Sequence, residues 1–315
     1  MDIIDGLLKG ERRALAKAIS LVENEDPRKK ETLKQIYPHT GKAYIIGFTG
    51  APGSGKSSLV DRVVKVMRGE GKTVGIIAVD PTSPFTGGAI LGDRIRMQEH
   101  TEDKDVFIRS MGTRGSLGGL SRATRDTVQL MDAFGKDIII IETVGVGQSE
   151  VDIVKNADTT IVVLTPAGGD SVQTIKAGIM EIADIFVINK SDLPNADRTR
   201  TEVSVMLDLD EKRKWRPPIV QTITLNNEGT DELWKEIIGH RAYLEGEDLL
   251  ANLRLERAKR DIEDHIEYIV KNRVWDQVTG TNMFEKALKQ IHHKETDPYT
   301  AAYSILERIS LDNKD

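Results

Sequence analysis

The sequence predicts an α/β fold, in which a mostly parallel sheet carries helices on both faces. Three observations predict this class. Apolar runs typical of strands alternate with segments of helical periodicity between residues 41 and 246. Several of the apolar runs contain no polar residue, as expected for strands that are covered on both faces. A glycine-rich loop follows the first predicted strand directly and leads into a predicted helix.

The residues before this series, 1–40, predict an N-terminal helical arm. Apolar side chains recur at helical spacing from Ile4 to Val22, and the dipeptide Asp26-Pro27 ends the pattern. A second short helix is expected over residues 31–37, because Pro38 stops it. We expect the arm to pack on the main domain in a structural role.

The series itself, residues 41–246, predicts the main domain. Strands are expected at residues 44–49, 74–79, 106–108, 138–141, 160–164, 185–188 and 218–222. Helices are expected at residues 58–67, 118–134, 171–183, 195–208 and 229–245. A strand–helix–strand series makes the strands parallel, and ligands of such sheets bind at the carboxyl ends of the strands. The candidate site residues below all fall at such ends.

Residues 247–315 predict a C-terminal helical extension with no strand pattern. Helices are expected around residues 248–272, 281–292 and 298–310. This segment is heavily charged and has too little apolar surface to fold alone. We therefore expect it either to pack back on the main domain or to pair with another chain.

The composition excludes several classes of function. The chain has 315 residues and a net charge of −6, which does not favour a nucleic-acid partner. It has no cysteine, so disulfides, thiol catalysis and cysteine-ligated metals are excluded. No apolar run approaches the roughly 20 residues of a membrane span. The acidic N-terminus lacks the apolar core of a signal peptide, so we expect a cytoplasmic protein without a membrane partner.

The glycine-rich loop fits the phosphate-binding pattern G-x-x-x-x-G-K-[ST] at every fixed position. Its glycines let backbone N–H groups turn towards a phosphate, and the start of the next helix adds partial positive charge. Lys56 would reach the β- and γ-phosphates, and the Ser57 hydroxyl would bind Mg²⁺. A glycine-rich turn with a chance lysine is the alternative, and the fitting strand and helix weigh against it. The expected nucleotide ligands are Gly50, Pro52, Gly53, Ser54, Gly55, Lys56, Ser57 and Ser58.

A second motif, Asn189-Lys190-Ser191-Asp192, follows the predicted strand 185–188 and fits the guanine-reading pattern N-K-x-D. A carboxylate at Asp192 can accept hydrogen bonds from the ring N–H and the exocyclic amine of guanine. Adenine presents an acceptor at the ring position, so the carboxylate would repel it. Lys190 can lie along the base and Asn189 can join loops. A polar exit from a strand is the alternative explanation.

Three acidic residues are candidates for a Mg²⁺ site beside the phosphates. Asp80 and Glu142 each follow an apolar strand, and Asp93 lies in a glycine-rich stretch. Glu142 occupies the first position of a D-x-x-G-like motif, whose Gly145 can offer its N–H to a γ-phosphate. The alternatives are a capping carboxylate at Asp80 and a solvated surface charge at Asp93. Contact with the metal is either direct or through water.

Two glycine-rich stretches predict loops that reorganise with the nucleotide. The first, residues 81–119, also carries scattered arginines. The second begins at Pro166 and leads into a helix that bears Lys176. The arginines are Arg94, Arg96, Arg109 and Arg114.

Taken together, five motifs resemble the MeaB/ArgK family, and the resemblance covers residues 1–250 closely and the helical extension loosely. Members of this family are G-protein chaperones of adenosylcobalamin-dependent methylmalonyl-CoA mutase, once described as kinases of an arginine/ornithine transport system. The motifs are Gly50–Ser57, Val79-Asp80-Pro81-Thr82-Ser83, Gly92-Asp93-Arg94-Ile95-Arg96-Met97, Met111-Gly112-Thr113-Arg114-Gly115 and Glu142-Thr143-Val144-Gly145-Val146-Gly147-Gln148.

The resemblance implies a P-loop domain of the SIMIBI type that binds GTP or GDP with Mg²⁺ and hydrolyses GTP. It implies that Asp80, Asp93 and Glu142 serve the Mg²⁺ site, with Asp93 moving in and out of it. It implies that residues 167–180, with Lys176, form a third switch that responds to the mutase. The residues it implies for the reaction are Lys56, Asp80, Asp93, Glu142 and Lys176.

The resemblance also implies the partners. The client would be an adenosylcobalamin-dependent acyl-CoA mutase, of the methylmalonyl-CoA type, whose cofactor loading and protection GTP turnover would gate. The helical extension would help to form a homodimer.

The chain departs from the family pattern at two positions. Relatives usually have a T-S-A-like base loop, where this chain has Thr222-Ile223-Thr224-Leu225. Backbone contacts to the guanine carbonyl need no side chain, so Thr224 is retained as a base-loop residue. Relatives often have a histidine where this chain has Ser116, so no general base is assigned there.

A phosphate loop is also compatible with three other functions. A P-loop small-molecule kinase would use ATP, and Asn189–Asp192 argue against ATP. A metal-insertion GTPase typically carries a cysteine and histidine cluster, and His292-His293 is the one adjacent histidine pair in a cysteine-free chain. A targeting GTPase of the signal-recognition type would need a basic or methionine-rich surface, which the sequence does not indicate.

Overall fold

The computed structural model describes residues 3–80, 100, 102–112, 122–143, 156–166, 180–209, 213–279 and 281–309. Of Asp80 and Met180 it describes the backbone alone. The chain divides into two compact units, Met1–Leu250 and Ala251–Asp315. Each unit is described by itself.

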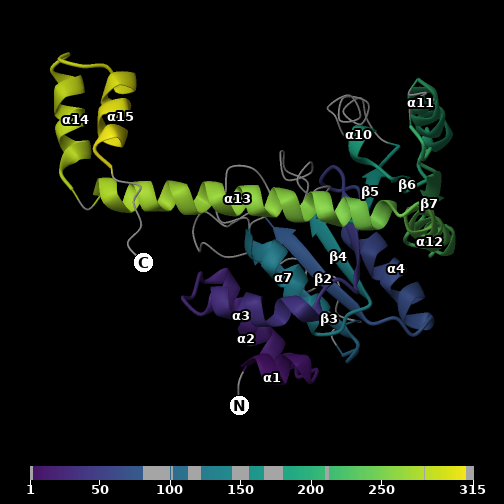
Figure 1. Cartoon of the computed structure of the whole chain (residues 1–315). Coiled ribbons are helices and arrows are strands. Elements are labelled where there is room, and N and C mark those ends of the chain that lie inside the picture. Colours follow the sequence, from purple (N-terminus) through teal and green to yellow (C-terminus); the bar gives the residue numbers. More distant parts are fainter. Residues whose placement is uncertain are drawn as a thin grey trace. The chain divides into compact units, whose positions relative to one another are not determined.

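The first unit is built on a seven-stranded sheet in which every paired strand is parallel. The strand order is β3-β2-β4-β1-β5-β6-β7. The α/β class predicted from the alternation is thus confirmed (Figure 1). The strands are β1 (Tyr44–Thr49), β2 (Val74–Asp80), β3 (Val106–Gly112), β4 (Ile138–Thr143), β5 (Thr159–Leu164), β6 (Ile185–Asn189) and β7 (Ile219–Thr222).

Helices cover both faces of this sheet. One face packs against α4 (Lys56–Gly69) and α12 (Thr230–Gly246), through strand residues such as Ile46 and Ile161. The opposite face packs against the arm and α7 (Arg122–Ala133) at one end of the sheet, and against α11 (Ala196–Asp208) at the other. A single turn of helix, α10 (Met180–Ile182), precedes β6. Because both faces are buried, β1, β4, β5 and β6 are buried at every residue.

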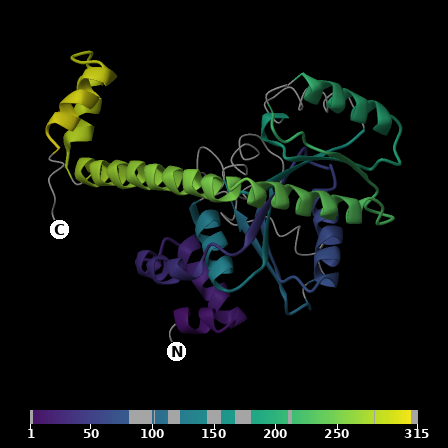
Figure 2. The same ribbon diagram turned by 45° about the vertical axis from the view of Figure 1, so that its right-hand side comes forward.

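The arm is part of the core of the first unit. It consists of α1 (Ile3–Leu8), α2 (Arg12–Glu23), α3 (Lys29–Ile36) and a 3₁₀ turn at Tyr37–His39. Leu15, Ile19 and Val22 of α2 are fully buried in one cluster with strand residues such as Ile77. Figures 1 and 2 show the arm beside α7. Helices occupy most of residues 3–39, with a break at Gly10 that the periodicity did not indicate, where φ is +80°.

Two sequence expectations change in this unit. The strand expected over residues 106–108 continues to Gly112, so Arg109 lies in β3 rather than in the loop predicted for residues 81–119. The physical reason is lateral pairing with β2, which extends from Val74–Val106 to Asp80–Gly112. The residues 118–121 and 171–179, where helices were expected to begin, lie outside the described residues.

The second unit consists of most of α13 (Leu249–Thr279) with α14 (Met283–His292) and α15 (Pro298–Glu307). Its small core contains Val278, Ala287, Ala301 and Ile309. The rings of Trp275 and Phe284 meet edge to face with centroids 5.7 Å apart, which joins α13 to α14. Among the described residues, no helix combines the length and the apolar character needed to cross a bilayer.

Candidate functional site

The loop between β1 and α4 has the backbone shape that a phosphate cradle requires. Gly50, Gly53 and Gly55 have φ angles of +141°, +78° and +88°. A Cβ on Gly50 would lie 2.2 Å from the Val163 carbonyl oxygen, and one on Gly55 would lie 2.3 Å from Asn189 Nδ2. Glycine is therefore required at both positions by conformation and by space.

Lys56 opens α4 and turns back over this loop. Its Nζ donates to the carbonyl oxygens of Gly50, at 2.6 Å, and of Ala51, at 3.0 Å. The residue is 6% exposed. These two hydrogen bonds hold the ammonium group at the mouth of the loop, where a bound phosphate would meet it.

Ser57 and Glu142 bring two hard oxygen ligands together. Ser57 Oγ donates to Glu142 Oε1 over 2.5 Å, although the residues are 85 positions apart. Glu142 is 1% exposed near the end of β4. The register pairs Ala78 with Glu142 and Val79 with Thr143, so Asp80 continues β2 towards the same edge. Ser57, in the first turn of α4, and Glu142, near the end of β4, therefore lie at the same edge of the sheet.

Asn189 joins this phosphate loop to the predicted base loops. The residue is fully buried at the end of β6. Its Nδ2 donates to the Ser54 carbonyl oxygen at 2.8 Å, and its Oδ1 accepts from the hydroxyl groups of Thr222 at 3.1 Å and Thr224 at 3.3 Å. One amide side chain at the end of β6 therefore connects the phosphate loop to the loop that contains Thr222 and Thr224.

Lys190 and Asp192 lie on the turn that follows. Lys190 has φ +58°, and its Nζ donates to the Gly53 carbonyl oxygen at 2.8 Å. Asp192 is exposed. The turn is held by the hydrogen bond from Ser191 N to Thr222 O at 3.1 Å and by that from Leu193 N to Lys190 O at 3.0 Å. These backbone hydrogen bonds place the turn with Asp192 next to the segment that leads to Thr224.

Some predicted site residues receive no structural account. Asp93, Gly145 and Lys176 lie outside the described residues, and for Asp80 the backbone alone is described.

Two further residues of the site were not predicted from the sequence. Thr222 orients the Asn189 amide, and Val163 approaches Gly50 so closely that no side chain fits there. No short-range pattern indicates either contact, because each partner lies on a distant strand.

The close approach at Gly55 gives a testable expectation. Gly55→Ala places a methyl group against the Asn189 amide and forces a left-handed backbone on an alanine, so we expect the variant to lose GTP binding by about tenfold or more. Titration calorimetry with GDP and GTP measures this. Gly71→Ala is the matched control, since Gly71 also has a positive φ, +77°, but no atom of the described residues lies within 4 Å of a Cβ placed there. Equal affinities of the two variants would contradict the expectation.

The residues present fit a guanine nucleotide with Mg²⁺. Ser54 Oγ is buried and has no hydrogen-bond partner within the part of the chain that the structure describes, so a polar atom is left inside the cradle. The ranges described contain no cluster of three or more His, Asp or Glu side chains able to hold a metal by themselves.

This parallel sheet, with a phosphate loop after β1 and an Asn-Lys-Ser-Asp turn after β6, defines the class of P-loop GTPases. The family follows from sequence comparison. The family model described as "Methylmalonyl Co-A mutase-associated GTPase MeaB" matches residues 15–282, and the chain belongs to this family. It is therefore a GTPase, and the resemblance stated from the motifs is confirmed.

Individual relatives agree. A protein of Pyrococcus horikoshii with a GTPase name is 53% identical over 98% of both chains. "GTPase ArgK" of Escherichia coli is 35% identical over 96% of this chain and 94% of its own. "Methylmalonic aciduria type A homolog, mitochondrial" of Mus musculus is 40% identical over 73% of this chain and 60% of its own. The crystal structure of "LAO/AO transport system kinase" has a TM-score of 0.69 and 30% identity, and covers 97% of this chain and 95% of its own.

Proposed function

We propose that this GTPase is a chaperone of an adenosylcobalamin-dependent acyl-CoA mutase of the methylmalonyl-CoA type, and that GTP turnover gates the loading and protection of the mutase cofactor. The supporting observation is the extent of the family match. A model named for association with methylmalonyl-CoA mutase matches residues 15–282, which include most of the arm and all of α13. The likeness is therefore not confined to the parts that any P-loop GTPase needs.

The proposed roles of the site residues follow their geometry and the family. The Lys56 ammonium group neutralises the β- and γ-phosphates. Ser57 and Glu142 hold Mg²⁺ with Asp80 and Asp93, and the metal supplies charge stabilisation to the transferred phosphoryl group. Asp192 reads the guanine edge. The remaining proposed residues are Gly50, Pro52, Gly53, Ser54, Gly55, Ser58, Gly145, Asn189, Lys190 and Thr224 for the nucleotide, and Lys176 for the response to the client.

We also propose a homodimer formed through the helical extension, residues 247–315. Among the exposed large apolar side chains of α13, four that are between 46% and 67% exposed in the single chain follow a regular spacing. Their spacing of seven, four and three residues places them along one stripe of the helix. They are Leu255, Ile262, Ile266 and Ile269. A second copy of the stripe is a suitable cover for this surface.

A small-molecule kinase is the second candidate, because the similar crystal structure carries a kinase name. The Asn189–Asp192 turn argues against it, since a carboxylate at Asp192 disfavours adenine. Transfer of ³²P from ATP to arginine or ornithine would support the kinase instead.

The experiment that tests the chaperone proposal uses purified methylmalonyl-CoA mutase. We expect the mutase to bind the protein loaded with a non-hydrolysable GTP analogue and to raise its GTP hydrolysis by about tenfold or more, as partner-supplied groups do in other GTPases. The controls are albumin in place of the mutase and Lys56→Ala in place of the wild type. A mutase that neither binds in any nucleotide state nor changes the rate would contradict the proposal.

A further inference from the structure

A segment that leads into β3 lies along one face of α4, from Asp61 to Arg68. We call it the strap; it consists of His100 and residues 102–106. Asp61 and Arg68 of α4 are seven residues apart, so they project from the same face about 10 Å apart along the helix axis. His100 Nε2 lies 3.2 Å from Asp61 Oδ1, and Arg68 Nε donates to Asp103 Oδ2 over 2.8 Å. The strap is therefore attached to α4 at two points.

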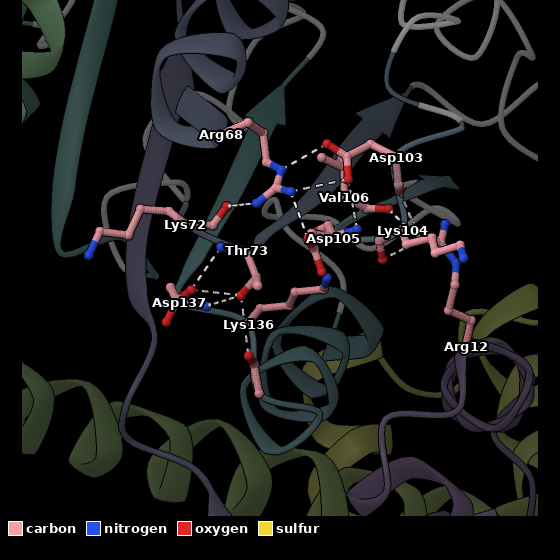
Figure 3. Close-up of polar contacts among 11 residues, drawn as sticks. Arg12, Arg68, Lys72, Thr73, Asp103, Lys104, Asp105, Val106, Lys136 and Asp137 are labelled. Carbon is pink, nitrogen blue, oxygen red and sulfur yellow. Dashed lines mark hydrogen bonds and ion pairs between the residues drawn. The ribbon is translucent and has the colours of Figure 1, made fainter. Parts of the chain in front are cut away.

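Arg68 makes the stronger of these two attachments (Figure 3). Its guanidinium group binds both oxygens of Asp103, at 2.8 and 3.3 Å, and Asp105 Oδ2 at 2.7 Å. Its Nη1 also donates to the Lys72 carbonyl oxygen at 2.6 Å, which closes the end of α4. The hydrogen bond from Arg68 lowers the pKa of Asp103 below its usual value. A planar fork of donors is required for this set of acceptors.

The side chain of Arg12, the first residue of α2, binds the backbone of the strap (Figure 3). Its Nη1 donates to three carbonyl oxygens, of Asp103 at 3.2 Å, Lys104 at 2.8 Å and Val106 at 2.8 Å. The guanidinium carbon lies 5.5 Å from the centre of the Phe107 ring. These contacts join the arm to the strap and need only a positive group with several N–H donors.

A third support comes from the turn between α7 and β4. Lys136 Nζ donates to the Asp105 carbonyl oxygen at 2.7 Å (Figure 3). Lys136 is 5% exposed, and burial lowers its pKa to about 8. The strap is thus held on one side by the arm and by Lys136, and on the other side by α4.

We propose that the strap is the joint through which the N-terminal arm holds α4 in place, and that Arg12 and Arg68 are positioning residues for GTP hydrolysis. The helix α4 begins at Lys56 and Ser57 and carries Arg68 in its last turn, about 18 Å away. On its other side this end is held by the hydrogen bond from Trp234 Nε1 to Glu70 Oε1, at 2.8 Å. Without the strap this end of α4 keeps its apolar packing on the sheet, through the fully buried Met67 for example, and its hydrogen bond to α12, but it loses its polar attachments towards the arm, which lets α4 tilt.

A tilt of α4 displaces the phosphate-binding end, where geometry matters most. A misplacement of about 1 Å in a catalytic group can cost up to about 10²-fold in rate. Binding of the base is less affected, because Asp192 lies on the turn after β6 and not on α4. The proposal rests on the GTPase activity of the family and not on the mutase, so failure of the chaperone proposal leaves it untouched.

The test measures kcat for GTP hydrolysis without any client, the Kd for GDP, and the midpoint of urea unfolding. The variants are Arg12→Ala, Arg12→Lys, Arg68→Ala, Arg68→Lys and the alanine double variant. The matched control is Arg198→Ala, because Arg198 forms an exposed ion pair with Glu202 on α11. Each lysine variant keeps the charge and most of the side-chain length, so these variants decide the test even if an alanine variant does not fold.

We expect each alanine variant to lower kcat about tenfold while the Kd for GDP changes by less than about threefold. Arg12→Lys should keep kcat within about twofold, because an ammonium group can donate to the same carbonyls. Arg68→Lys should lower kcat as much as Arg68→Ala, because lysine lacks the planar fork of N–H donors that a guanidinium group has. The double variant should be no slower than the slower single variant, since both residues act through one strap.

Two outcomes would overturn the proposal. The first is wild-type kcat in the Arg12 and Arg68 variants together with a lower midpoint of unfolding, since the residues would then serve stability alone. The second is recovery of the wild-type rate by Arg68→Lys, which would show that charge rather than the fork is needed.

Discussion

Replacement of Lys56 by alanine is expected to lower kcat/KM for GTP hydrolysis on the order of 10³-fold, because a preorganised positive group facing the phosphates is lost. GTP binding should weaken about 10- to 100-fold, as expected for loss of a hydrogen bond to a charged group. The structure supports a large effect. Lys56 is 6% exposed and is held by the carbonyl oxygens of Gly50 and Ala51, so its ammonium group is in place before a nucleotide binds.

The matched control for this prediction is Lys42→Ala. Lys42 is exposed and precedes β1, at the end of that strand opposite the phosphate loop. Its replacement by alanine therefore removes the same charge from the same unit. Titration calorimetry with GDP and GTP, and phosphate release under saturating Mg²⁺, measure the two effects. Undiminished GTP affinity of Lys56→Ala would contradict the assignment of the phosphate loop.

The positions of the strand ends could be predicted from the sequence, and with them much of the site. Apolar runs such as Ile138–Ile141 mark buried strands, and the residues that follow them reach one edge of a parallel sheet. This reasoning places Ser57 and Glu142 at the same edge of the sheet, although they are 85 residues apart in the sequence. The reasoning applies because the local sequence pattern identifies each strand, and the handedness of the crossovers makes the strands run in the same direction, so that their carboxyl ends meet at one edge of the sheet.

Contacts that depend on lateral packing could not be predicted in this way. Arg12 meets the strap across 91 to 94 residues of sequence, and no spacing rule indicates which distant loop a helix will contact. Arg109 was assigned to a loop because of the glycines around it, yet pairing with β2 extends β3 through that position. Arg109 instead forms an ion pair with Glu23 of α2. In both cases the position of the residue depends on a contact with a distant part of the sequence, which local composition does not indicate.

Replacement of Asp192 by asparagine is expected to reverse the preference between GTP and xanthosine triphosphate. The carboxylate can accept two hydrogen bonds from guanine, and each bond to a charged group contributes about 1.5–3 kcal/mol, so GTP should lose about 10²- to 10⁴-fold relative to xanthosine triphosphate. The amide of asparagine can donate to the xanthine carbonyl that replaces the exocyclic amine. A change of base preference, rather than a general loss of binding, is therefore the expected result.

The surroundings of Asp192 make this a clean test of base reading. The residue is exposed, and its turn is held by backbone hydrogen bonds from Ser191 and Leu193, which the substitution leaves in place. Asp197→Asn is the control, because Asp197 is also exposed, lies in the first turn of the nearby α11 and accepts from the Gln221 side chain. Competition binding with both nucleotides gives the ratio of the two Kd values. An unchanged ratio in Asp192→Asn would show that this carboxylate does not read the base, whereas an altered ratio in Asp197→Asn as well would trace the change to α11.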